Sequence, residues 1–278
     1  MRWIRAIVMM VTLLAPASAA WPQSTVTPTP SDESRARAAG WGTGTWRDQH
    51  EAINRLARSG NPDVVFLGDS ITQSLGGPGR TVGCPVPGLL GKRFPDAGNF
   101  GISGDRTQHL LWRIDNGNFD GIDPKVVVLL IGTNNLAHDS AEDIAVGIEA
   151  VVERLERTCP TTAIMLCSIV RGKGPDAPLR AKAVRTNELT SPLGERPRVT
   201  LVDLESVFYL PGGAADPSLM AGDFVHFTPD GYRAWMDALE PVVAGARPLP
   251  PRDGSGADSV TVDCASVGGE LATVGGGE

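Results

Sequence analysis

Short apolar runs alternate along the chain with segments whose apolar residues recur at helical spacing. The apolar runs lie at residues 64–67 (VVFL), near Asn99 and Phe100, at 126–131 (VVVLLI), at 163–169 and at 199–204. The clearest of them are apolar at every position rather than at every second one, which is typical of strands buried on both faces. The pattern therefore predicts five strands inside a sheet that is covered on both sides.

Four segments between and around these runs are predicted to be helices, namely Trp46–Ser59, Gln108–Ile114, the stretch after Ser140, and residues 229–243. Ser140 has N-cap chemistry, and the apolar residues that follow it fall on one helix face. Thr228 and Pro229 have the chemistry of an N-cap and a first helical residue. Strands that alternate with helices predict an α/β fold, a three-layer α/β/α sandwich around a five-stranded parallel sheet.

The two ends of the chain have a different composition from this core. Residues 1–19 combine a basic start, a short apolar run and an A-x-A sequence at 17–19, which predicts a signal peptide and a secreted or periplasmic protein. The alternative is a membrane anchor, but the apolar run is shorter than the roughly 20 residues that a spanning helix needs. Residues 20–42 are predicted to be a linker, residues 43–245 the folded domain, and residues 246–278 a Gly- and Pro-rich tail.

Composition narrows the range of ligands. With a net charge of -7, the chain of 278 residues has no basic excess that would favour nucleic acid, and no stable membrane insertion is expected. No Cys-x-x-Cys spacing and no Asp/Glu ligand cluster is evident, so we expect neither a metal nor a cofactor. In an exported protein, the four cysteines Cys84, Cys159, Cys167 and Cys264 allow three pairings, and Cys167 in its apolar run is also compatible with a buried thiol.

Polar residues follow the predicted strands, where ligands of open α/β sheets bind. Ser70 comes directly after the run at 64–67, where it is either a nucleophile or a helix cap. Asn134 follows the run at 126–131, where it is either a carbonyl-oxygen donor or a turn residue. Asp223 and His226 precede the last helix at a spacing that allows the carboxylate to hold the imidazole in one tautomer. A surface Asp and a capping His are the alternative.

Together with the glycine block NFGISGD at 99–105, the sequences GDSIT, GTNN and DFVH resemble the SGNH (GDSL-like) hydrolase family. Within that family, the stretches NFGISGD, HLLWRIDNG and PKVVVLLIGTNN resemble in particular the catalytic subunits of brain platelet-activating-factor acetylhydrolase. The resemblance implies a flavodoxin-like SGNH fold and a catalytic triad of Ser70, Asp223 and His226. It also implies an oxyanion hole formed by the backbone N–H groups of Ser70 and Gly104 and the side-chain amide of Asn134.

The expected activity is hydrolysis of carboxylic esters with a short acyl group such as acetyl. A small-molecule or carbohydrate ester is the expected partner, and acetylated polysaccharide would suit an exported enzyme. A lipid-directed esterase is the first alternative, and it would need an apolar acyl channel. A non-catalytic carbohydrate-binding protein on a hydrolase fold is the second, and the complete set of catalytic residues argues against it.

Overall fold

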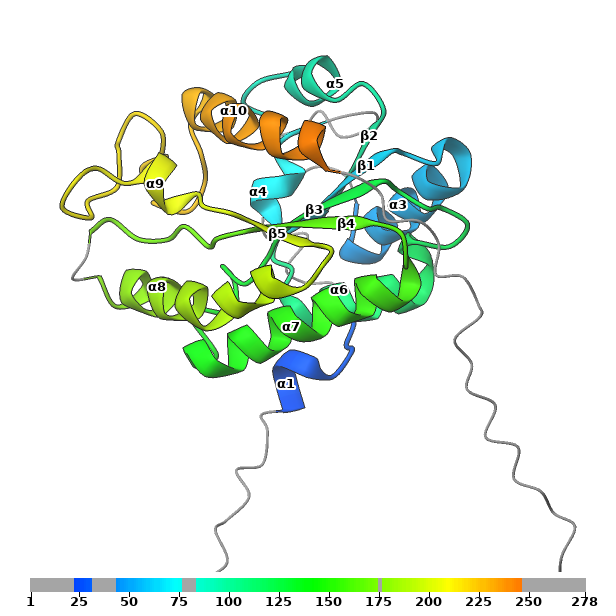
Figure 1. Cartoon of the computed structure of the whole chain (residues 1–278), viewed down its shortest axis with the longest axis horizontal. Coiled ribbons are helices and arrows are strands. Elements are labelled where there is room, and N and C mark those ends of the chain that lie inside the picture. Colours follow the sequence, from blue (N-terminus) through cyan, green and yellow to red (C-terminus); the bar gives the residue numbers. More distant parts are fainter. Residues whose placement is uncertain (1–22, 32–43, 77–83, 175–176, 247–278) are drawn as a thin grey trace, which may run out of the picture.

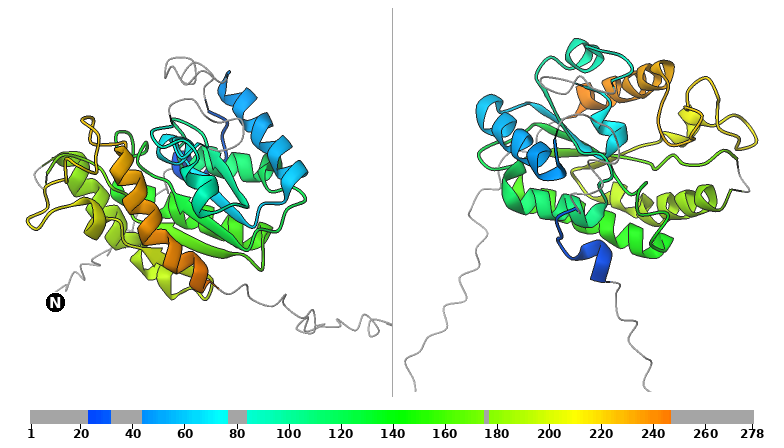
Figure 2. Two further views of the ribbon diagram at one scale, coloured as in Figure 1. Left: turned by 90° about the horizontal axis from the view of Figure 1, so that it is seen from above. Right: turned by 180° about the vertical axis from the view of Figure 1, so that it is seen from behind.

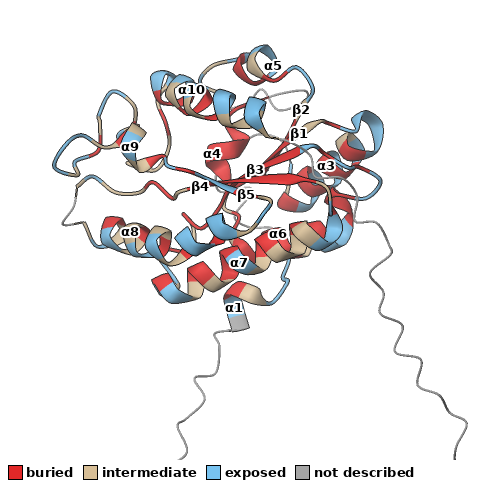
Figure 3. Cartoon of the chain, viewed as in Figure 1, coloured by how far each residue is buried: buried red, intermediate tan, exposed pale blue. Residues whose placement is uncertain are grey.

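The computed structural model describes residues 23–31, 44–76, 84–174 and 177–246. Its centre is a sheet of five parallel strands, as predicted from the sequence. The strands are β1 (Val64–Gly68), β2 (Ala97–Gly101), β3 (Val126–Leu130), β4 (Ala163–Cys167) and β5 (Val199–Val202), and they lie in the order β2-β1-β3-β4-β5. The inner strands are almost fully buried, which explains their unbroken apolar sequence (Figure 3).

Helices cover both faces of this sheet (Figures 1 and 2). One layer contains α3 (Trp46–Gly60), α6 (Thr107–Arg113) with the π-helical turn η1 (Ile114–Asn118), α7 (Ala141–Thr158), α8 (Pro178–Thr190) and the 3-10 turn η2 (Ser191–Glu195). The other contains α4 (Ser70–Gln73), α5 (Leu89–Arg93), α9 (Glu205–Phe208) and α10 (Pro229–Gly245). Alternate side chains of each strand enter the two layers: Val65 and Leu67 of β1 pack on the first, and Phe66 on the second.

The strand order changes direction at β1. From β1 the chain moves outward to β2, then returns to β3 on the other side of β1 and continues to β4 and β5. Loops that leave the carboxyl ends of β1 and β3 therefore diverge to opposite sides, and open α/β sheets bind their ligands at such a switch point. The residues that follow β1 and β3 are Asp69–Ser70 and the turn that contains Asn134.

Helix α8 was not predicted from the sequence, because its buried face is largely polar. Arg180, Ala183, Thr186 and Thr190 form that face. The guanidinium of Arg180 donates to both carboxylate oxygens of Glu205, at 2.7 and 3.1 Å, and lies over the ring of Tyr209. A partly buried ion pair thus takes the place of the apolar stripe that sequence patterns detect.

Of the segment predicted to be a linker, residues 20–42, the structure describes residues 23–31, and these contact the domain. Residues 23–26 form the short helix α1 (Gln23–Val26), which lies against α6 and α7 (Figure 1). Thr25 is fully buried, and its carbonyl accepts a hydrogen bond from the hydroxyl of Thr107 at 2.9 Å. The backbone N–H of Thr29 donates to the carbonyl of Gln108. These backbone contacts dock a segment whose polar composition gave no sign of packing. The predicted signal peptide (1–19) and all but the first residue of the predicted tail (246–278) lie outside the described residues.

The three described cysteines, Cys84, Cys159 and Cys167, are not bonded to one another. Each of the three possible pairings of four cysteines joins two of these three, so none of the complete pairings is present. Cys159 and Cys167 are buried thiols, and burial raises their pKa to about 11 and about 12. Cys264 lies outside the described part of the chain. Among the described helices, none has the length and apolar character needed to cross a bilayer.

Candidate active site

Ser70 lies at the sharp turn between β1 and α4. Asp69 is the N-cap of α4, and its Oδ1 accepts a hydrogen bond from the backbone N–H of Ile71 at 3.0 Å. Ser70 is the first helical residue and is 7% exposed. Within the described residues, its backbone N–H has no hydrogen-bond acceptor, as expected for the first turn of a helix. The turn thus presents a hydroxyl and a free N–H side by side.

Two glycines allow the strand ends to approach this turn closely. A Cβ atom on Gly68 would lie 2.3 Å from the carbonyl oxygen of Leu130, and one on Gly101 would lie 2.3 Å from the backbone nitrogen of Gln73. Any side chain at either position would force apart α4 and the ends of the neighbouring strands. Glycine at 68 and 101 is therefore required for the packing around Ser70.

Asp223 both fixes the backbone of the turn to His226 and contacts the His226 ring. Oδ1 of Asp223 accepts hydrogen bonds from the backbone N–H groups of Val225 and His226, both at 3.0 Å. Its Oδ2 lies 2.6 Å from Nδ1 of His226. Phe224 between them has φ = +52°, a conformation that is strained for a bulky residue. The hydrogen bonds of Asp223 keep the turn in this shape.

His226 connects this turn to Ser70. Its Nε2 lies 2.9 Å from Oγ of Ser70, across 156 residues of sequence. Burial acts to raise the pKa of Asp223, but the hydrogen bonds that its carboxylate accepts from the ring and backbone of His226 and from the backbone of Val225 outweigh burial and lower it. A carboxylate, an imidazole and a hydroxyl in this order can transfer the hydroxyl proton to the ring and stabilise the imidazolium that forms.

Gly104 lies on the loop after β2, with φ = +80°. A residue with a Cβ atom would be strained in this conformation, so the backbone requires glycine here. In the described part of the chain, the N–H of Gly104 has no hydrogen-bond acceptor. The side chain of Gln73, on α4, holds this loop: its Oε1 accepts a hydrogen bond from the backbone N–H of Ser103 at 2.7 Å.

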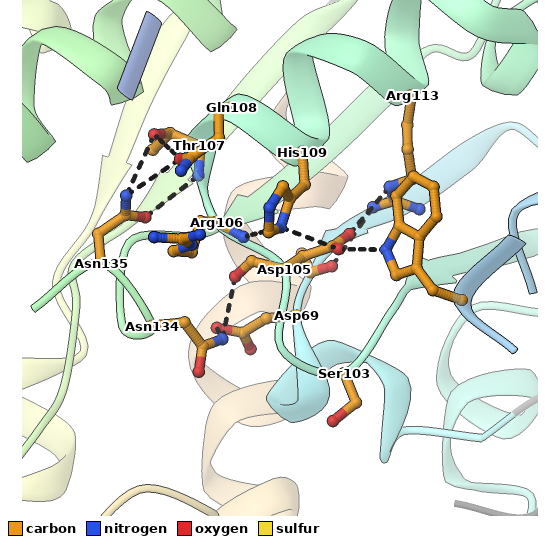
Figure 4. Close-up of polar contacts among 12 residues, drawn as sticks. Asp69, Ser103, Asp105, Arg106, Thr107, Gln108, His109, Arg113, Asn134 and Asn135 are labelled. Atoms are coloured by element: carbon orange, nitrogen blue, oxygen red, sulfur yellow. Dashed lines mark hydrogen bonds and ion pairs between the residues drawn. The ribbon is translucent and has the colours of Figure 1, made fainter. Parts of the chain in front are cut away.

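Asn134 bridges the loops that follow β1 and β2 (Figure 4). Its Nδ2 donates to Oδ2 of Asp69 at 3.1 Å and to the backbone carbonyl of Asp105 at 2.9 Å. A primary amide nitrogen carries two hydrogens, so both are engaged in this structure. An oxyanion that binds to Asn134 must therefore compete for one of these two hydrogens.

The carboxyl group of Asp69 is fully buried, and burial raises its pKa to about 7. The N–H of Ile71 and the nearby His226 act to lower this pKa, whereas the charge of Asp105 acts to raise it. Burial thus favours the protonated form of Asp69 over a wider pH range than in an exposed aspartate, while its Oδ2 is bonded to Asn134. This is an electrostatic feature of the site that the sequence motif did not reveal.

Comparisons with known proteins agree with this geometry. Residues 66–234 match the model of the GDSL-like Lipase/Acylhydrolase family, which is more than half of the chain. This protein belongs to the GDSL-like hydrolase family. It is an ester hydrolase, as predicted from the four sequence blocks.

Several relatives of this GDSL-like hydrolase are named as acetylhydrolases. Subunit alpha2 of platelet-activating factor acetylhydrolase IB from Rattus norvegicus is 36% identical over 195 residues, which cover 69% of this chain and 80% of the relative. Subunit alpha1 of the same acetylhydrolase from Bos taurus is 33% identical over 222 residues, which cover 75% of this chain and 90% of the relative.

Solved structures show the same fold at low sequence identity. A GDSL-like lipase from Bacteroides thetaiotaomicron superimposes with a TM-score of 0.55 at 19% identity, covering 71% of this chain and all of the other. A catalytic mutant of an acetylxylan esterase from Geobacillus stearothermophilus superimposes with a TM-score of 0.54 at 20% identity, covering 69% of this chain and 97% of the other.

The other three histidines of the hydrolase have other surroundings. His50 is buried against the ring of Trp46, and burial lowers its pKa to about 4. His109 accepts a hydrogen bond from the backbone N–H of Arg106, and His138 is exposed. In the described residues, no group of three or more His, Cys, Asp or Glu side chains could hold a metal ion.

The sequence analysis missed the residues that support the site from behind. Asn99 is one: its Nδ2 donates to the carbonyls of Thr72, Gln73 and Gly76, while its Oδ1 accepts from the N–H of Gly101. It therefore ties the end of β2 to α4. Asn99 opens the glycine block of the family, so its position in that block was the available signal.

Proposed function

We propose that Ser70, His226 and Asp223 are the catalytic triad of a serine esterase. The observation that carries the proposal is the continuous contact from Oδ2 of Asp223 to Nδ1 of His226, at 2.6 Å, and from Nε2 of His226 to Oγ of Ser70, at 2.9 Å. The second contact joins two segments that lie 156 residues apart in the sequence, so local capping does not account for it. The free N–H groups of Ser70 and Gly104 point to the same chemistry.

In the proposed reaction, Oγ of Ser70 attacks the ester carbonyl carbon while Nε2 of His226 accepts the serine proton. The carbonyl oxygen becomes an oxyanion that receives hydrogen bonds from the N–H groups of Ser70 and Gly104 and from Nδ2 of Asn134. The carbon–oxygen bond to the alcohol then breaks, and the alcohol leaves with the proton from His226. Water repeats the sequence on the acyl-serine, which releases the carboxylic acid and restores the Ser70 hydroxyl.

We further propose that the acyl group is short, with acetyl the preferred one. The names of the relatives support this choice, since they include acetylhydrolases at 33–36% identity and an acetylxylan esterase of the same fold. Acetylated carbohydrate is the proposed natural substrate, in keeping with the proposed export of the protein. A lipid-directed esterase would instead accept long acyl chains.

A panel of p-nitrophenyl esters from acetyl to octanoyl, together with acetylated xylan, tests both proposals. Acetyl and propionyl esters should give the highest kcat/KM, because each methylene that the pocket cannot accommodate loses binding energy or adds strain. A kcat/KM that increases up to octanoyl would replace the short-acyl proposal with the lipid-directed one.

The same panel should be run on Ser70→Ala, which is expected to lose activity by a factor on the order of 10^3 or more. Ser103→Ala is a matched control, because Ser103 lies on the Gly104 loop (Figure 4) and its hydroxyl makes no hydrogen bond to the triad within the described residues. Wild-type turnover by a folded Ser70→Ala protein would end the serine-esterase proposal.

A further inference from the structure

A buried charged cluster lies directly behind the Gly104 loop. The side chains of Asp105 and Arg113 are both 0% exposed, and Nε of Arg113 lies 2.9 Å from Oδ2 of Asp105 as an ion pair. The indole N–H of Trp46, which is 1% exposed, donates to Oδ1 of Asp105 at 2.7 Å. His109 lies 3.6 Å from the same oxygen (Figure 4). A carboxylate without solvent depends on such partners for its orientation.

The cluster is fixed to the sheet by Arg113. Its Nη1 donates to the carbonyl of Phe100 at 2.9 Å, and its Nη2 lies 3.5 Å from the carbonyl of Gly68. These carbonyls belong to residues at the carboxyl ends of β2 and β1, next to the candidate active site. Arg113 therefore gives the Asp105 carboxylate a fixed partner, and Trp46 fixes it from a second direction.

The backbone of Asp105 connects this cluster to the oxyanion donors. Its carbonyl oxygen accepts one hydrogen of the Asn134 amide at 2.9 Å, and its nitrogen is joined to Gly104. A change in the backbone conformation at Asp105 would therefore displace both Gly104 and the carbonyl that orients Asn134. An oxyanion hole depends on donors that are already in place when charge develops, so small displacements affect the rate.

We propose that Trp46 is a positioning residue of the oxyanion hole and acts through Asp105. This inference rests on the proposed function. Trp46 is the first residue of α3 and precedes the segment matched by the family model, residues 66–234. A helix outside the matched core thus contributes a contact that orients the proposed catalytic donors. Trp46 is also separable from the ion pair, since loss of its N–H leaves the charges of Asp105 and Arg113 paired.

The test is Trp46→Phe, which keeps an aromatic ring and removes the N–H donor. We expect kcat for p-nitrophenyl acetate to fall about tenfold, which corresponds to about 1.4 kcal/mol of transition-state stabilisation, with KM changed less than twofold. Trp112→Phe is the matched control, because Trp112 packs on Trp46 with ring centroids 5.5 Å apart but makes no hydrogen bond to Asp105 in the part of the chain that the structure describes. It should keep the wild-type kcat.

Active sites should be counted by titration with a fluorophosphonate, so that partial unfolding does not lower the measured kcat. If Trp46→Phe does not fold, β-(3-benzothienyl)alanine in place of Trp46 preserves the ring shape and removes only the N–H. A wild-type kcat in either folded variant would overturn the proposal, as would an equal loss in Trp112→Phe.

The combination of Trp46→Phe with Asn134→Ala separates a positioning role from a general loss of stability. Trp46 acts on both Gly104 and Asn134 through Asp105, so Asn134→Ala should remove part of its tenfold effect and leave the part that passes through Gly104, about threefold. Fully multiplicative effects would overturn the proposal even if each single variant is slow. Ser70→Ala distinguishes the two levels of inference: if it stays active, the proposed function fails, whereas failure of the Trp46 variants alone leaves the triad intact.

Discussion

Replacement of Asn134 by alanine removes the one side-chain donor of the proposed oxyanion hole. In the structure, Nδ2 of Asn134 donates to Asp69 and to the carbonyl of Asp105, at 3.1 and 2.9 Å. The variant Asn134→Ala therefore removes a donor from the transition state and also removes a partner from the fully buried Asp69. Two independent quantities should change, and each has its own expected magnitude.

The catalytic effect follows from the charge that develops on the carbonyl oxygen. Loss of one oxyanion donor lowers kcat by about 10^2 to 10^3, with KM little changed because the bond strengthens mainly in the transition state. The structural effect arises because the variant leaves Oδ2 of the buried Asp69 without the hydrogen bond from Asn134. A buried acceptor left without a partner costs about 1 to 3 kcal/mol of the free energy of unfolding.

Steady-state kinetics on titrated active sites and urea unfolding of the same preparations measure the two effects separately. Asn134→Asp should lower kcat at least as much, because its carboxylate repels both the oxyanion and Asp69. A less stable Asn134→Ala protein whose titrated sites keep the wild-type kcat would remove Asn134 from the reaction and leave it as a residue that supports the turn.

Two further predictions concern the buried carboxyl group and the N-terminus. Asp69→Asn should gain stability relative to the wild-type protein as the pH increases from about 4 to about 7, by up to about 1.4 kcal/mol per pH unit, and the difference should then level off. The sign follows from the pKa of about 7 for Asp69 in the folded protein: in this range the unfolded chain ionises while the folded one stays protonated, so wild-type stability decreases. Urea unfolding at several pH values measures it, and a pH-independent difference would contradict the buried-carboxyl argument. The mature protein should begin near Ala20 or Trp21 and be found outside the cytoplasm; amino-terminal sequencing decides this, and an intact Met1 in a cytosolic fraction would contradict it.

Most of the sheet was predictable because its strands are buried on both faces. Such strands have unbroken apolar sequences, and β1, β3 and β4 are of this kind. The edge strand β5 and the glycine-rich β2 have weaker patterns, yet both lie close to where the sequence placed them. Helix α8 escaped prediction because the partner of its buried Arg180 is Glu205, which is 25 residues away in sequence.

The residues of the candidate triad were predictable for a different reason. Ser70 follows a buried strand, and Asp223 and His226 share one turn, so each has a local sequence signal. The contact between Trp46 and Asp105 has no such signal, since 59 residues separate them and each residue alone is compatible with many environments. Local patterns identify the proposed reacting groups of this hydrolase, whereas the contacts that hold them in place are visible only in the folded chain.

The arrangement around Asn134 also relates catalysis to protonation. When Asp69 is ionised, its Oδ2 is a strong acceptor that competes with the substrate oxyanion for a hydrogen of Asn134. When Asp69 is protonated, this competition weakens, because a neutral carboxyl oxygen accepts less strongly. The backbone carbonyl of Asp105 holds the other hydrogen in both states, so the amide keeps its orientation. The buried carboxyl group is therefore placed to tune a proposed oxyanion donor, while the ion pair behind the Gly104 loop keeps that donor in position.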